Sequence, residues 1–266
     1  MRRNRPKIVS IANQKGGVGK TTTAINLGAA LAARGSKVLL IDLDPQGNAS
    51  TGLGISRDQR GLTTYDLLLS DADIQSTARS TGFDGLSIVP ATTDLSSADA
   101  QMMSGPRRLS HLKMALSQSA SDFDTILIDC PPSLNLLTLN GLVAADTLLV
   151  PLQSEFFALE GLSQLLLTVK EVRASANPKL RLEGIVLTMY DARNNLSRQV
   201  EADVRDTLGD LVYQTRIPRN VRLSEAPSYS MPIFSFDPLS KGAVAYRMLA
   251  GEFLRRNPAE PEPAHV

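Results

Sequence analysis

The fold is decided by the stretch Gln14-Lys15-Gly16-Gly17-Val18-Gly19-Lys20-Thr21-Thr22, which lies between an apolar run at 8–12 and a helical pattern at 21–33. A strand, a glycine-rich turn, Lys-Thr and a helix in this order are typical of a phosphate-binding loop. Glycines let the backbone turn its N–H groups inward around an anion, and the helix N-terminus adds its positive end. In such a loop Lys20 reaches the β- and γ-phosphates, and the Thr21 hydroxyl binds Mg²⁺.

The loop departs from the common pattern at its first position. The usual first glycine lies five residues before the glycine of the Gly-Lys pair, and here that position is Gln14. A second lysine, Lys15, stands directly before the glycines instead. It lies too far around the turn to duplicate Lys20, but it can reach a nucleotide held by a second copy of the chain. The alternative, a glycine-rich turn with two solvated lysines, is disfavoured because strand, loop and helix all agree.

Length and composition indicate one globular domain. The chain has 266 residues, 42% of them hydrophobic and 21% charged, which is ordinary for a compact α/β protein. We expect one domain over residues 1–256, followed by a disordered tail at 257–266 that is rich in Pro, Ala and Glu. The net charge is +1, so any nucleic-acid contact must come from a local patch. One cysteine, Cys130, excludes a disulfide framework within the chain and fits a reducing cytoplasm.

Segments with strand and helix patterns alternate along the chain. Runs that predict strands cover 8–13, 37–42, 86–90, 123–129, 146–151, 182–190 and 211–216, and helical patterns cover 21–34, 64–69, 94–103, 107–117, 155–172, 197–208 and 240–256. This alternation predicts an α/β fold with a doubly wound, mostly parallel sheet and helices on both faces, as in P-loop NTPases. In such sheets ligands bind beyond the carboxyl ends of the strands.

Acidic residues follow two of the predicted strands at that edge. Asp44 lies in the loop Asp42-Leu43-Asp44-Pro45-Gln46-Gly47-Asn48, where it is well placed to face a γ-phosphate or, in the alternative, to cap a helix. Asp129 ends the strand at 123–129 and has the position of a Walker B carboxylate, which holds Mg²⁺ directly or through water. Cys130 follows it, and we expect a packed small residue there, not a nucleophile, because no base accompanies it.

These motifs resemble the ParA/MinD family of ATPases, whose phosphate loop is a deviant Walker A motif with an extra lysine. The resemblance implies ATP and Mg²⁺ as cofactors, with residues 15–22 (Lys15, Gly16, Gly17, Val18, Gly19, Lys20, Thr21 and Thr22) around the phosphates and with Thr21 and Asp129 at the metal. It also implies a homodimer that encloses two nucleotides, in which Lys15 reaches the partner's phosphates. Hydrolysis then depends on Lys15, Lys20 and Asp44, with Asp44 orienting water.

The run 217–227, together with 188–193, looks like the chromosomal ParA (Soj) branch. That resemblance implies adenine contacts from Pro218 and Asn220 and sequence-independent contacts to double-stranded DNA. The resemblance implies that Arg193 and Arg222 contact the DNA, and the clustering of cations along the chain adds Arg219 and Lys241 as expected DNA-binding residues. Charge alone favours a solvated face balanced by neighbouring acids over a DNA-binding surface. The branch further implies a ParB-like centromere-binding partner and a cytoplasmic, nucleoid-associated protein.

Three other functions remain open. A ParA-like protein that positions another cargo, such as a plasmid, a chemoreceptor array or a microcompartment, would have the same chemistry. A MinD-type division regulator would need a C-terminal amphipathic helix for the membrane, and the prolines and acids at 258–263 disfavour one. A metabolic P-loop enzyme, such as a biotin-synthesis ligase, would need a small-molecule pocket that the sequence does not identify.

Overall fold

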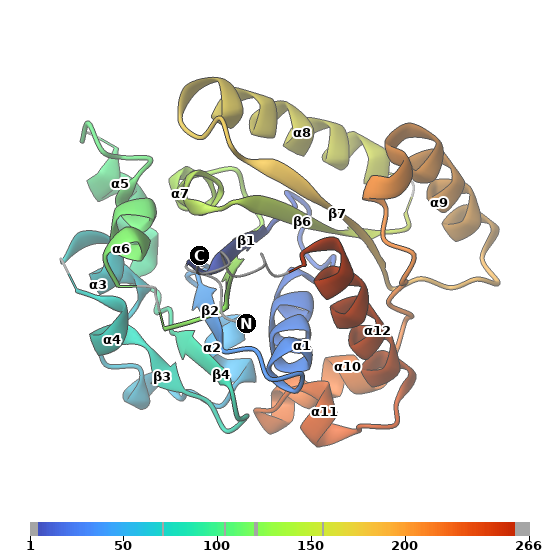
Figure 1. Ribbon diagram of the computed structural model, residues 1–266, viewed down its shortest axis with the longest axis horizontal. Helices are drawn as coiled ribbons and strands as arrows, with labels where there is room; N and C mark the ends of the chain where they lie inside the picture. Colours follow the sequence, from blue (N-terminus) through green and yellow to red (C-terminus); the bar gives the residue numbers. More distant parts are fainter. Residues whose placement is uncertain (1–4, 71, 104, 120–121, 156, 259–266) are drawn as a thin grey trace, which may run out of the picture.

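The computed structural model describes residues 5–70, 72–103, 105–119, 122–155 and 157–258. At its centre is a seven-stranded sheet in the order β3-β4-β2-β5-β1-β6-β7 (Figure 1). The strands are β1 (Lys7–Ile11), β2 (Val38–Asp42), β3 (Arg79–Ser80), β4 (Leu86–Val89), β5 (Thr125–Asp129), β6 (Thr147–Gln153) and β7 (Arg181–Thr188). Every neighbouring pair is parallel except β3 with β4. The predicted, mostly parallel sheet is therefore confirmed.

Helices cover both faces of this sheet, as predicted. They are α1 (Lys20–Ala32), α2 (Asn48–Gly52), α3 (Thr64–Leu69), α4 (Ile74–Thr77), α5 (Leu95–Met102), α6 (His111–Ser119), α7 (Leu136–Ala144), α8 (Ala158–Ser175), α9 (Asn195–Leu208), α10 (Val221–Glu225), α11 (Ile233–Phe236) and α12 (Lys241–Arg256). Residues of a strand alternate between two cores: Ile126 and Ile128 join the core under α7 and α8, and Leu127 joins the core under α1 and α12.

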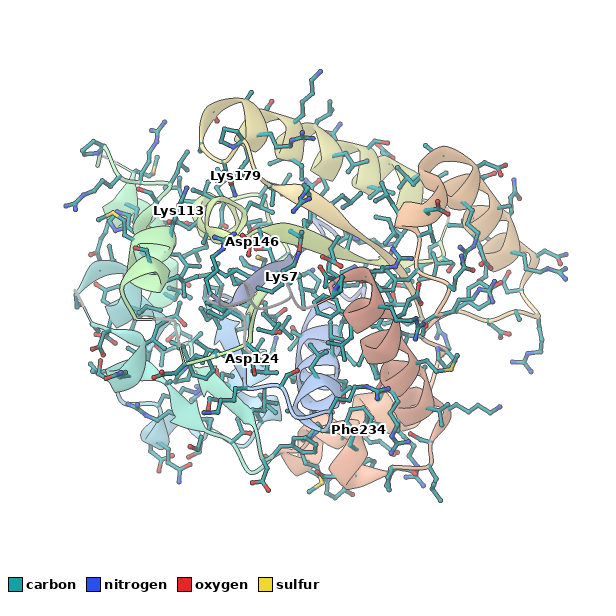
Figure 2. All side chains as sticks on the ribbon, viewed as in Figure 1. Lys7, Lys113, Asp124, Asp146, Lys179 and Phe234 are labelled. Atoms are coloured by element: carbon teal, nitrogen blue, oxygen red, sulfur yellow. The ribbon has the colours of Figure 1, made fainter. Side chains whose placement is uncertain are left out.

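The strand register brings the predicted acids beside the phosphate loop. Asp129 pairs in register with Ile11 on one side and with Asp42 on the other. At the amino ends of the strands, acidic side chains accept hydrogen bonds from the backbone. Asp146 Oδ2 accepts from Ile8 N at 3.0 Å, and Asp124 Oδ2 accepts from Lys37 N at 2.7 Å. Figure 2 labels both of these acids. These two acids are therefore occupied by backbone donors, whereas Asp129 ends its strand beside the phosphate loop.

The predicted strand at 211–216 is not formed. Only isolated bridges join this segment and its continuation to the sheet edge, at Val212 and Pro218. The backbone N–H groups of Gln214 and Thr215 donate instead to the Glu252 carboxylate of α12, at 2.8 and 2.9 Å. Tyr213 N still donates to Ile185 O of β7 at 2.9 Å, but the Glu252 carboxylate takes the next two backbone donors and interrupts a regular strand ladder.

Helix positions agree with the predicted segments, with shifted starts. The helix predicted from 107 begins at His111, and the one predicted from 155 begins at Ala158. The terminal helix ends at Arg256, as predicted. Residues 259–266 of the predicted tail lie outside the described residues, so the division into a domain and a tail stays a prediction. No helix in the described ranges is long and apolar enough to cross a membrane.

Candidate nucleotide site

The phosphate-binding loop joins β1 to α1. Gly17 and Gly19 have φ values of 74° and 85°, a left-handed conformation that glycine adopts at little steric cost. Lys20 is the first residue of α1, is only 6% exposed, and donates from Nζ to Lys15 O at 2.8 Å. Burial lowers the pKa of Lys20, and the charge of Asp129 acts against that shift. The ammonium therefore points into the loop, where a phosphate-binding loop holds its anion.

Residues distant in the sequence fix the loop in place. Thr188 Oγ1, at the end of β7, donates to Val18 O at 2.8 Å. Asn13 Nδ2 donates to Pro151 O at 2.8 Å, and Asn13 Oδ1 accepts from Lys15 N at 3.0 Å. The loop is thus held from β6 and β7, which preorganises its backbone donors.

Asp129 has the features of a metal ligand. Both of its carboxylate oxygens are buried and make no regular hydrogen bond among the described residues, and the Thr21 side chain lies close enough to favour the ionised form. Burial, reinforced by the charge of Asp42, raises the pKa of Asp129 well above its usual range. Leaving a carboxylate without donors is costly, and a hard cation such as Mg²⁺ relieves that cost.

The composition of the site also fits Mg²⁺ bound with a nucleotide. The part of the chain that the structure describes contains no group of three His, Cys, Asp or Glu side chains that could hold a metal. Mg²⁺ commonly uses one or two carboxylates and takes its other oxygens from water and phosphates. Asp129 together with the Thr21 hydroxyl matches that ligand set.

Asp44 lies in a compact turn directly after β2. It is 8% exposed, its Oδ1 accepts from Gln46 N at 2.9 Å, and its carbonyl accepts from Gly47 N at 2.9 Å. Its neighbour Asp42 points into the protein, where its Oδ2 accepts from the Ser50 backbone and hydroxyl at 2.8 and 2.6 Å. Burial raises the pKa of Asp42 to about 6. Asp42 therefore anchors α2, and Asp44 is the acid available near the phosphate loop.

Cys130 behaves as the packed residue that the sequence predicted. Its side chain is buried, and burial, together with the charge of Asp129, raises the pKa of its thiol to about 12. A thiol with that pKa stays protonated near neutral pH and is a poor nucleophile.

The side chain of Lys15, the second lysine of the loop, does not point into the phosphate-binding loop. Lys15 Nζ forms an ion pair with Glu155 Oε2 at 2.6 Å, and the two side chains are 39% and 45% exposed. Gln153 Nε2 donates to the other oxygen of the same carboxylate. The role of Glu155 was not predicted from the sequence, although an acid two residues beyond a strand that ends at this edge is a recognisable signal.

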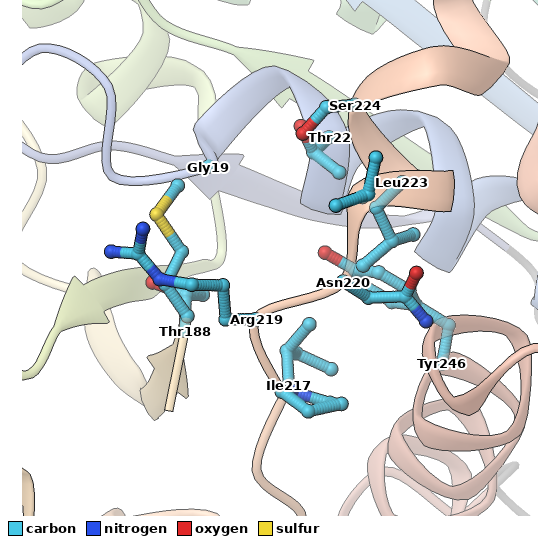
Figure 3. Close-up of a pocket in the computed structure, with 12 residues that line it drawn as sticks. Gly19, Thr22, Thr188, Ile217, Arg219, Asn220, Leu223, Ser224 and Tyr246 are labelled. Atoms are coloured by element: carbon cyan, nitrogen blue, oxygen red, sulfur yellow. The ribbon is translucent and has the colours of Figure 1, made fainter. Parts of the chain in front are cut away.

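A pocket of about 230 Å³ adjoins the loop, between Gly19 and Thr22 on one side and the segment 217–224 on the other (Figure 3). This segment is held to the end of β7, because Ile217 N donates to Leu187 O at 2.8 Å and Tyr190 N to Ile217 O at 3.0 Å. Pro218 and Asn220 both line the pocket, as the adenine prediction requires. Asn220 Oδ1 caps α10 by accepting from Arg222 N at 2.8 Å.

The predicted DNA-binding cations lie in the loops before α9 and α10 and on the helices α10 and α12. Arg193 precedes α9 and makes two bonds to Asp191, at 3.0 and 2.9 Å. Arg222 on α10 pairs with Glu225 at 2.9 Å and with Asp237 at 3.4 Å. Within the described ranges Arg219 and Lys241 form no ion pair; Arg219 lines the pocket, and Lys241 begins α12.

A glycine-rich phosphate loop before a helix, an orphaned acid at the tip of the adjacent strand, and a pocket beside the loop define a P-loop nucleotide-binding protein. A family described as an AAA domain matches residues 6–182. The chromosome partitioning protein ParA of Caulobacter vibrioides is 54% identical over 258 residues, which cover 96% of this chain and 97% of that protein.

Two further proteins resemble the chain over nearly its whole length. The chromosome-partitioning ATPase Soj of Treponema pallidum is 51% identical over 251 residues, 94% of this chain and 98% of that one. The structure of cobyrinic acid a,c-diamide synthase from Mycobacterium smegmatis, with bound ADP and magnesium, is 41% identical, has a TM-score of 0.82 and covers 94% of each chain. The chain belongs to the ParA/MinD family of P-loop ATPases, and the predicted family is confirmed.

Proposed function

We propose that this chain is a chromosome-partitioning ATPase that closes as a dimer around two ATP molecules with Mg²⁺ and binds DNA without sequence preference. A ParB-like centromere-binding protein then stimulates hydrolysis and releases the dimer from the nucleoid. The observation that carries this proposal is the position of Lys15: its ammonium pairs with a half-exposed carboxylate outside the loop, from where it can reach a second copy. Similarity over nearly the whole chain to partitioning proteins supports the same conclusion.

The site residues divide the chemistry as follows. Lys20 and the backbone N–H groups of residues 16–22 hold the phosphates and stabilise the charge that develops on them. Thr21 and Asp129 hold Mg²⁺, which when bound neutralises phosphate charge. Asp44 orients the attacking water, and Lys15 adds a positive charge from the other subunit. The magnesium and ADP in the similar M. smegmatis structure support this assignment.

The base pocket is consistent with adenine. The Oδ1 atom of Asn220 caps α10, so within the part of the chain that the structure describes the Nδ2 group of Asn220 is free to donate a hydrogen bond to a ring nitrogen of the base. Pro218 provides an apolar contact surface and has no N–H to compete. Figure 3 shows Arg219 and Asn220 on opposite sides of the pocket.

DNA binding would draw on cations that are partly neutralised within a single chain. Arg193 and Arg222 form ion pairs with acidic side chains, so DNA phosphates would have to displace those acids. Arg219 and Lys241 form no such pair within the described residues and could bind phosphate directly. A dimer presents each cation twice, so weak contacts of one chain add up when ATP joins two. This explains how nucleotide state could switch sequence-independent binding.

The test is DNA retention by the purified protein with ADP, ATP or a slowly hydrolysed ATP analogue, on unrelated DNA sequences and over a salt series. We expect strong, salt-sensitive, sequence-independent binding with ATP and the analogue only. A lack of retention in every nucleotide state would reject partitioning on DNA. A positioner of another cargo would behave identically in this assay, and stimulation by a ParB-like protein separates the two.

A further inference from the structure

Arg60 is a buried cation close to the candidate water-orienting loop. It is 3% exposed and forms no ion pair within the described residues. Its guanidinium donates only to neutral oxygens: Nε to Ile55 O at 3.3 Å, Nη1 to Ala91 O, and Nη2 to Thr51 Oγ1 at 2.9 Å and to Gly47 O at 3.4 Å. Burying an arginine is costly unless its donors are satisfied, so this arrangement needs a reason.

The four acceptors belong to three different segments. Gly47 and Thr51 are the N-cap and the fourth residue of α2, Ile55 lies in the loop that follows α2, and Ala91 lies beyond the end of β4. Arg60 therefore ties α2 to the sheet edge on one side. On the other side Ser50 is tied to Asp42, and the Ser50 hydroxyl also accepts from Ala91 N at 3.0 Å. Helix α2, only one turn and a half long, is held by side chains on both flanks.

The turn at residues 43–47, which contains Asp44, is fixed at both ends by these contacts. It begins after Asp42, which is fixed to Ser50, and it ends at Gly47, whose carbonyl is bonded to Arg60. Inside the turn, the N–H groups of Gln46 and Gly47 donate to Asp44. The Gln46 N–H holds the Asp44 carboxylate and the Gly47 N–H holds the Asp44 carbonyl, so the Gln46–Gly47 backbone links Asp44 to the Arg60 anchor.

Gly47 and Arg60 also fit each other sterically. Gly47 has a φ of 64°, and a Cβ at this position would collide with Arg60 Nη1 and approach Ala91 O at 2.9 Å. The left-handed backbone alone would favour glycine, but the contact adds a second requirement. The guanidinium occupies the space that any larger residue at 47 would need.

We propose that Arg60 is a positioning residue for hydrolysis: it fixes Gly47 and α2, and through them the orientation of Asp44. The inference rests on the proposed role of Asp44. A lysine cannot replace the arginine, because four acceptors on three segments require the forked donors of a guanidinium and lysine is a single point charge. Displacing a catalytic group by as little as 1 Å can lower a rate about 100-fold.

The test compares steady-state hydrolysis and ATP binding in Arg60→Lys, Thr51→Val and Arg57→Gln. We expect Arg60→Lys to lower kcat about tenfold or more, with the Kd for ATP within about threefold of wild type because the phosphate loop is untouched. Thr51→Val removes one acceptor of Arg60 together with the bond from the Thr51 hydroxyl to Gly47 O at 3.1 Å, and it should produce a smaller loss of kcat in the same direction. Arg57→Gln, at an exposed arginine three residues away, is the matched control and should behave as wild type.

Amide hydrogen exchange of residues 44–51 with the ATP analogue bound gives a readout that does not depend on turnover, and it should be faster in Arg60→Lys. Unchanged kcat in Arg60→Lys and Thr51→Val, with turnover lost in Asp44→Ala, would overturn this inference alone. Normal turnover in Asp44→Ala would remove the proposed role of Asp44 as well. A parallel loss of ATP affinity and kcat would show a purely structural arginine. If Arg60→Lys does not fold, Thr51→Val decides.

Discussion

Replacing Glu155 by glutamine should tighten ATP-dependent dimerisation. Lys15 now pairs with Glu155 at 2.6 Å, and it must leave that partner to reach the nucleotide of a second subunit. Glutamine keeps the shape of the side chain and its acceptor for Gln153, but it removes the charge that holds Lys15. The closed dimer, in which the pair is already broken, loses nothing by this change.

The size of the effect follows from exposure. The two side chains are 39% and 45% exposed, so the pair contributes about 0.2–1 kcal/mol. Two such pairs break when a dimer forms, which amounts to about 0.4–2 kcal/mol, or about 2- to 30-fold in the dimer Kd. Because the pair is solvated, the effect should shrink as salt is raised.

Sedimentation velocity over a concentration series, with the slowly hydrolysed ATP analogue, measures this Kd. Glu160→Gln is the matched control: it removes the same charge from an exposed acid in the first turn of α8 that has no ion pair within the described residues. Weaker dimerisation of Glu155→Gln, or no difference from Glu160→Gln, would refute the idea that Lys15 must be released from Glu155.

Four other substitutions test separate parts of the structure. Lys20→Ala should weaken ATP binding at least about tenfold, because a charge-assisted contact to phosphate is lost; titration with a fluorescent ATP analogue measures this, and unchanged affinity would disprove the loop assignment. Asp44→Ala should lower kcat about 100-fold or more while ATP still binds, dimerises the protein and keeps it on DNA; normal phosphate release would count against it. Arg222→Glu should lose DNA retention and still dimerise with ATP; wild-type retention would place the DNA surface elsewhere. Glu252→Gln should cost about 2–4 kcal/mol in urea unfolding, since its buried carboxylate accepts from two backbone donors and a hydroxyl. Burial opposes ionisation of Glu252, but those donors prevail and lower its pKa. The advantage of wild type over Glu252→Gln should therefore be full above the pKa of the unfolded chain, about 4.3, and fade as pH falls through the lower folded value; an advantage that grows in acid would contradict this.

The sequence predicts those features that are encoded locally. Short apolar runs such as 126–128 specify buried parallel strands, and the glycines at 17 and 19 specify a turn that other residues resist. The carboxyl ends of parallel strands meet at one edge, which is why Asp44 and Asp129 could be assigned to the same site as the loop.

The remaining features depend on contacts between distant residues. The segment 211–216 has a strand pattern, and only the position of Glu252, some forty residues later, shows where the N–H groups of Gln214 and Thr215 go. The partner of Lys15 lies 140 residues away. Arg60 looks in the sequence like its exposed neighbour Arg57, because the acceptors that justify its burial come from three separate segments.

The bond from Thr188 to Val18 spans 170 residues of chain, and the base pocket also needs Tyr246. During synthesis the phosphate-binding loop leaves the ribosome early, but the residues that shape its surroundings follow only near the end of translation. For much of its synthesis the nascent chain therefore lacks residues that complete the nucleotide site and the β7 side of the sheet. A product truncated before residue 217 therefore lacks one wall of the base pocket.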